Sequence, residues 1–154
     1  MAVLADRVDG VIGIDTHRDT LTAAAATTVG GLLGELVVAA DASGYQRLLD
    51  FARARVPGRR CFAVEGAGSY GAGLTRLLVE RGEWVVEVDR PKRPARRGGK
   101  SDALDAVRAA REALAQERLA APRRRGDREA LRVLLATRQG AVTPAPVPST
   151  SSRR

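Results

Sequence analysis

Residues 61–89 read CFAVEGAGSYGAGLTRLLVERGEWVVEVD, which is an apolar run, a helical pattern and a second apolar run. Cys61–Glu65 and Trp84–Val88 are short, apolar and bounded by turn-forming residues, as buried strands usually are. The apolar residues between them, which recur at helical spacing before Gly82, are Tyr70, Leu74, Leu77 and Leu78. A strand, a helix and a strand in this order form a right-handed crossover between parallel strands. This segment therefore predicts an α/β fold.

Three more strands are predicted on the N-terminal side, at Val11–Asp15, Leu21–Thr28 and Glu35–Ala40, with short polar or glycine-rich turns between them. From Ser43 to Pro57 the pattern is that of an amphipathic helix. Its apolar stripe consists of Tyr45, Leu48, Leu49, Ala52 and Val56. Together these elements predict a mixed five-stranded sheet, with three antiparallel strands followed by two parallel strands and their crossover helices.

The pattern changes after Asp89, because no further strand is predicted. Arg90–Lys100 contains two prolines, two glycines and six cations, which indicates a basic loop. A helix from Asp102 to about Leu119 follows, with Ser101 as its N-cap. The residues expected on its inner face are Ala103, Val107, Ala110 and Leu114.

The expected domain organisation has four parts. Residues 1–10 form an N-terminal extension and residues 11–120 the main domain. Residues 121–140 contain a basic break and a short helical pattern at 127–139, and 141–154 form a disordered tail rich in proline and serine.

Positive charge is concentrated in the middle of the chain. The 154 residues contain 26 Lys and Arg against 18 Asp and Glu, a net charge of +8. Residues 1–89 hold nine cations and twelve acids, whereas residues 90–125 hold twelve cations and four acids. Such clustering is typical of a surface that binds a phosphate backbone, although a GC-rich genome also raises the arginine content everywhere.

Composition excludes several classes of protein. The five aromatic residues are too few for a platform that stacks single-stranded bases. One cysteine and one histidine exclude a disulfide framework, a cysteine-cluster metal site and a histidine-rich metal site. No apolar run has the length of a membrane span, and no signal-peptide core is visible, so we expect a cytoplasmic protein.

Four carboxylates lie at the ends of predicted strands or in the first turn of a predicted helix. Asp15 and Glu65 end two strands that the predicted topology makes neighbours, at the sheet edge where ligands bind in open α/β sheets. Asp102 and Asp105 share one face of the first turn of a helix. Each acid alone has an ordinary explanation, because acids also begin turns and favour helix N-termini. Four convergent carboxylates, however, require compensation, and Mg²⁺ or Mn²⁺ would supply it.

The chain also resembles a known family, the DEDD transposases of the insertion-sequence-110 type, which are relatives of the Piv DNA invertase. The resemblance extends from about Val11 to Ala141. Its blocks are GIDTHRDT (Gly13–Thr20), VEGAGSYG (Val64–Gly71), RPKR (Arg90–Arg93) and GKSDALDA (Gly99–Ala106).

The resemblance implies a RuvC-like, RNase H-type catalytic domain that cleaves and transfers DNA strands. The four metal-binding acids of the family fall by motif on Asp15, Glu65, Asp102 and Asp105, with Mg²⁺ or Mn²⁺ as cofactor. DNA is the implied partner; some relatives also use a structured guide RNA, and full-length members form oligomers. The residues expected to bind nucleic acid are Arg90, Lys92, Arg93, Arg96, Arg97 and Lys100.

This chain departs mildly from the family pattern at Arg18, Asp89 and Ala103, where Lys, Asn and Pro are frequent. A larger departure is that the family's C-terminal domain, with its serine implicated in strand exchange, has no counterpart here. Two interpretations therefore stay open: a catalytic transposase domain, and a truncated remnant that binds nucleic acid without catalysis.

Two further features of the sequence each have more than one explanation. Gly66, Gly68 and Gly71 follow a strand and imitate a dinucleotide-binding fingerprint, with Asp89 ending the next strand, but Glu65 would face the pyrophosphate and no later strand continues the sheet. His17, two residues after Asp15, either polarises a metal site or makes a surface hydrogen bond.

Overall fold

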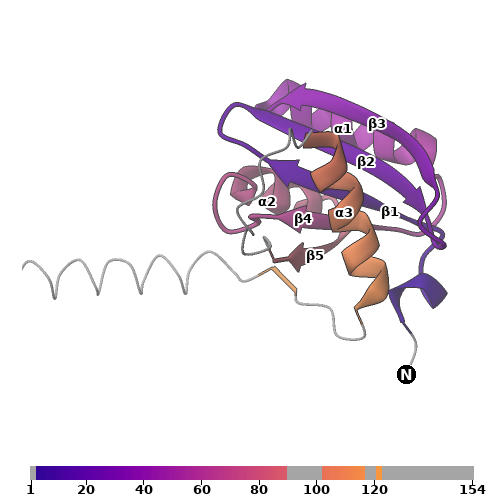
Figure 1. Ribbon diagram of the computed structural model, residues 1–154. Coiled ribbons are helices and arrows are strands. Elements are labelled where there is room, and N and C mark those ends of the chain that lie inside the picture. Colours follow the sequence, from indigo (N-terminus) through magenta and orange to yellow (C-terminus); the bar gives the residue numbers. More distant parts are fainter. Residues whose placement is uncertain (1–2, 90–101, 117–120, 123–154) are drawn as a thin grey trace, which may run out of the picture. The chain divides into compact units, whose positions relative to one another are not determined.

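The five strands form one mixed sheet in a computed structural model, which describes residues 3–89, 102–116 and 121–122 (Figure 1). All of these residues belong to one unit, Met1–Pro122. The strands are β1 (Gly10–Thr16), β2 (Thr20–Thr27), β3 (Leu32–Ala39), β4 (Arg60–Glu65) and β5 (Trp84–Val88). Their order is β3-β2-β1-β4-β5. β2 is antiparallel to β1 and β3, whereas β1, β4 and β5 are mutually parallel, so the predicted sheet is confirmed.

Helices cover both faces of the sheet. They are α1 (Ala42–Arg55), α2 (Ala72–Glu80) and α3 (Asp102–Ala115), with a short 3₁₀ helix, η1 (Leu4–Asp6), near the N-terminus. One hydrophobic core joins the sheet to α1 and α2, and a second core joins it to α3 and η1. Figure 1 shows α3 crossing the near face of the sheet, with α1 behind it. Within the described ranges, no helix is long and apolar enough to cross a membrane.

Three sequence predictions about the helices were wrong. Tyr70 lies in the turn before α2 rather than within the helix, and it is exposed. The third helix ends at Ala115, whereas the sequence predicted an end at about Leu119; Gln116 is not part of the helix. The inner face of that helix is also displaced from the predicted one, and it consists of Ala106, Ala109, Ala110 and Ala113.

Gly13 explains this displaced face. A Cβ added to Gly13 would lie 2.0 Å from the carbonyl oxygen of Ala106 and 2.6 Å from the amide nitrogen of Ala110. The helix backbone therefore rests directly on β1, and only alanine is small enough for the contact. Val107 and Leu114, seven residues apart, lie along one flank of this face and are only partly buried. This close approach fixes the position of α3 over the centre of the sheet.

The remaining predictions for the second half of the chain fall outside the described residues. They concern the basic loop 90–100, Ser101, the helical pattern at 127–139 and the tail 141–154.

Candidate metal centre

Asp15 and Glu65 lie side by side at the carboxyl edge of the sheet. β1 and β4 are parallel, and their register pairs Ile14 with Val64, the residues immediately before the two acids. Both carboxylates are almost fully buried, with relative exposures of 2% and 3%. The Thr16 hydroxyl donates a hydrogen bond of 2.7 Å to the carbonyl oxygen of Glu65 and so ties the two strand ends together. The adjacency predicted for these two strands is confirmed.

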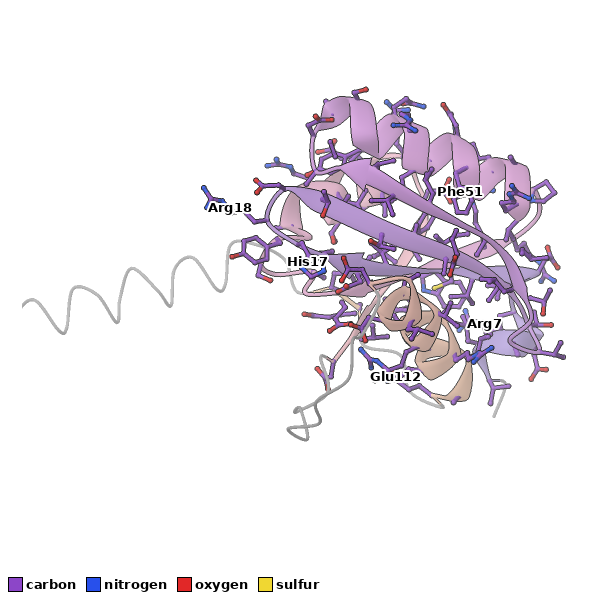
Figure 2. The ribbon with its side chains drawn as sticks, turned by 45° about the horizontal axis from the view of Figure 1, so that its top comes forward. Arg7, His17, Arg18, Phe51 and Glu112 are labelled. Atoms are coloured by element: carbon purple, nitrogen blue, oxygen red, sulfur yellow. The ribbon has the colours of Figure 1, made fainter. Side chains whose placement is uncertain are left out.

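His17 connects Asp15 to the start of α3. Its Nε2 lies 2.9 Å from Asp15 Oδ2 and 3.3 Å from Asp102 Oδ1. One ligand atom from each of these three residues lies within 4.8 Å of the others, a spacing that a single metal ion can span. The next residue, Arg18, points away from the body of the domain (Figure 2). Of the two interpretations that the sequence left open for His17, the geometry favours a place in the site.

Arg108, one turn beyond Asp105 on α3, is a member of the site that sequence reasoning missed. Its guanidinium donates a hydrogen bond of 2.8 Å to Glu65 Oε2 and one of 2.9 Å to Glu112 Oε2. Its Nε lies 3.9 Å from Asp105 Oδ1. The available signal was its spacing on the helix, i+3 from Asp105 and i−4 from Glu112. That spacing by itself predicts only an exposed ion pair, because it carries no information about Glu65.

The four predicted acids are linked through two basic side chains, although among the described residues only Asp15 and Asp102, with His17, have ligand atoms that all lie within 4.8 Å of one another. Asp15 and Asp102 share His17, and Glu65 and Asp105 flank Arg108. The six cations proposed for nucleic-acid binding, Arg90, Lys92, Arg93, Arg96, Arg97 and Lys100, lie outside the described residues.

The electrostatics of Asp15 reflect this crowding. Burial raises the pKa of its carboxyl above the ordinary value. The neighbouring His17 lowers that pKa, while the charges of Asp105 and Asp102 raise it further. Because the net direction is upward, the ionised form of Asp15 destabilises the folded protein in the absence of a cation.

Asp15→Asn is therefore expected to raise the thermal unfolding temperature of the metal-free protein at neutral pH. A carboxyl whose pKa is raised by folding costs stability once the pH exceeds its ordinary value of about 3.9, and the full cost is reached above the folded-state pKa. The advantage of Asn should thus be largest near neutrality and vanish as the pH falls toward about 4. Calorimetry of both proteins across this range measures it, and a constant difference at every pH would contradict the assignment.

The glycine turn after β4 is explained by tight packing. Gly66 has a φ of 73°, and its carbonyl oxygen accepts hydrogen bonds from the amides of Ser69 and Gly71. A Cβ on Gly71 would lie 3.0 Å from Thr16 Cγ2 and Val64 Cγ1.

A dinucleotide-binding sheet is mostly parallel, whereas here β2 and β3 are antiparallel to their neighbours. The dinucleotide hypothesis is therefore rejected.

Comparison with known proteins gave one family match. The sequence model of one protein family, the DEDD transposases of the IS110 type, matches residues 12–145 of the 154-residue chain, and the description of that family is transposase. No curated protein matches the sequence.

Proposed function

The chain belongs to the DEDD transposases of the IS110 type, and from this we propose that it cleaves and transfers DNA strands with a divalent-metal site built from Asp15, Glu65, Asp102 and Asp105. Membership implies DNA transposition and DNA binding. The sheet order β3-β2-β1-β4-β5, with β1, β4 and β5 parallel, is the RNase H-like topology consistent with such a domain.

The single observation that carries the proposal is the convergence of two buried strand-end acids with the first turn of α3. Carboxylate oxygens are the ligands that Mg²⁺ and Mn²⁺ prefer, and the His17 imidazole adds a nitrogen that favours a transition ion such as Mn²⁺ over Mg²⁺. The raised pKa of Asp15 fits the same view, because a bound cation relieves the cost of its charge. The residues present thus suit a divalent ion.

Each residue has a distinct part in this scheme. Asp15 and Glu65 are fixed by the sheet and would hold the cation from the strands. Asp102 and Asp105 would complete the carboxylate set from the helix, and His17, which contacts both Asp15 and Asp102, would add the nitrogen ligand. When bound, divalent ions activate the attacking oxygen and neutralise the charge that develops on the leaving oxygen of a phosphodiester.

A nicking assay on supercoiled plasmid tests the proposed function. The full chain should convert supercoiled plasmid to open circles with Mn²⁺ and leave it intact with EDTA. A chain that retards the plasmid in a gel but never nicks it would instead be the non-catalytic nucleic-acid binder, and that result would refute the proposed chemistry.

We further propose that the basic loop 90–100 binds the nucleic-acid backbone beside the acids, because it joins β5 directly to α3. Replacing Arg93, Arg96, Arg97 and Lys100 by Ala should weaken DNA binding alike for all sequences. The slope of log K against log salt should flatten by roughly one unit for each lost phosphate contact. Fluorescence anisotropy with duplex DNA and with a structured RNA measures this. An unchanged slope with an altered base preference would mean that these residues read bases.

A further inference from the structure

Arg108 occupies an unusual position for a surface-helix arginine. Three acids surround its guanidinium: Glu65 on the sheet, and Asp105 and Glu112 on its own helix. The Glu65 side chain is only 4% exposed, whereas that of Arg108 is 30% exposed. The guanidinium thus reaches from the solvent-facing side of α3 into the buried end of β4.

This contact contributes to the charge balance at the buried Glu65 carboxylate. A buried carboxylate without compensation is costly, and the guanidinium at 2.8 Å supplies a positive charge with good hydrogen-bond geometry. The same contact conflicts with a metal ion at Glu65. A divalent cation there would lie close to the guanidinium, and the two positive charges repel each other.

The chemistry of the guanidinium indicates which group it would bind if a cation displaced it from Glu65. Its planar set of donors matches the oxygens of a phosphate as well as those of a carboxylate, and it keeps its charge at any physiological pH. Within the described part of the chain, Arg108 Nε is buried and makes no hydrogen bond, so the fork is only partly used. A phosphodiester placed at the carboxylates would offer oxygens to the displaced guanidinium.

We propose that Arg108 couples metal binding to nucleic-acid binding: it holds Glu65 while the site lacks a cation and transfers to a backbone phosphate when metal and DNA bind together. This inference rests on the proposed metal site. By linkage, DNA then strengthens metal binding and metal strengthens DNA binding by the same factor. The coupling would limit metal-loaded carboxylates to complexes that already hold a substrate phosphate.

The test is the affinity for Mn²⁺, measured from the signal of free Mn²⁺ in electron paramagnetic resonance, with and without a short DNA duplex. Binding of Mn²⁺ to DNA alone is measured separately and subtracted. For the wild-type chain, DNA should tighten Mn²⁺ binding by about 5- to 150-fold, the usual range of coupling between two sites. In Arg108→Gln, Mn²⁺ should bind more tightly than to wild type in the absence of DNA, and DNA should change that affinity little.

Arg111→Gln is the matched control. It removes the same charge from the same helix, but Arg111 is exposed and contacts only the carbonyl oxygen of Gly30 among the interactions described. Its Mn²⁺ affinity and its response to DNA should stay close to those of wild type. Equal behaviour of the Gln variants at 108 and 111 would overturn the coupling role while leaving the metal site intact.

Two further outcomes are decisive. If Arg108→Gln does not fold without metal, Arg108→Lys takes its place, because lysine keeps the charge but lacks the planar pair of donors. DNA should then enhance Mn²⁺ binding less than in wild type, because lysine lacks the planar pair of donors that matches a phosphate, and an equal enhancement would overturn the proposal. Absence of Mn²⁺ binding by the wild-type chain would contradict the proposed metal site, and this inference with it.

Discussion

Asp15→Asn and Glu65→Gln are each expected to lower the rate of Mn²⁺-dependent plasmid nicking by roughly 10²- to 10³-fold. Metal ions stabilise the charge of a transition state by several kcal/mol, and about 1.4 kcal/mol corresponds to a tenfold change in rate. Both substitutions keep the size of the side chain and remove its negative charge, and both residues lie in strands that hold them in place. The initial rate of open-circle formation measures the loss.

Two exposed acids supply controls with the same chemical changes. Asp19 lies between β1 and β2 with a side chain that is 86% exposed, and Glu80 ends α2. Asp19→Asn and Glu80→Gln should nick at rates within about twofold of wild type, because neither acid belongs to the site and exposed ion pairs contribute little. Equal losses in all four variants would assign the effect to general electrostatics rather than to a metal centre.

Gly13→Ala should strongly destabilise the domain and disturb the candidate site. The new Cβ would lie 2.0 Å from a backbone carbonyl of α3, so no side-chain rotation can relieve the overlap. Overpacking of a core costs typically 1–3 kcal/mol, and we expect about 3 kcal/mol or more here because the obstacle is backbone. If α3 shifts, Asp102, Asp105 and Arg108 leave the site together.

Denaturant unfolding and the nicking assay distinguish a shifted helix from a simple loss of stability. Gly31→Ala is the control, because the nearest atom to its added Cβ is a side-chain oxygen at 3.1 Å. Gly13→Ala should show both a lower unfolding midpoint and no nicking under conditions where it is still folded. Full nicking by folded Gly13→Ala would show that the position of α3 does not matter.

Much of the fold was predictable because the relevant signals are local. The change from apolar runs to helical spacing indicates the strands and the crossover helices, and the predicted topology makes the first and fourth strands neighbours. That placement predicts that Asp15 lies beside Glu65, as the strand register confirms. The RNase H-like arrangement itself was implied by family resemblance, and the family match supports it.

The remaining features depend on tertiary contacts that no local pattern encodes. The inner face of α3 was misjudged because large apolar side chains usually mark the buried side, whereas the backbone approach at Gly13 admits only alanine. Arg108 was missed because its main partner, Glu65, lies 43 residues earlier in the chain. Tyr70 fits a helical spacing but lies in the turn before α2, where it is exposed.

The central claim is that these four acids bind a divalent ion, and thermal unfolding with Mn²⁺ tests it most directly. A ligand that binds only the folded state raises its stability as the ligand concentration exceeds Kd. Addition of millimolar Mn²⁺ should raise the unfolding temperature of the wild-type chain, whereas the same addition should leave the unfolding temperature of Asp15→Asn unchanged. An equal rise in the two proteins would contradict the metal centre.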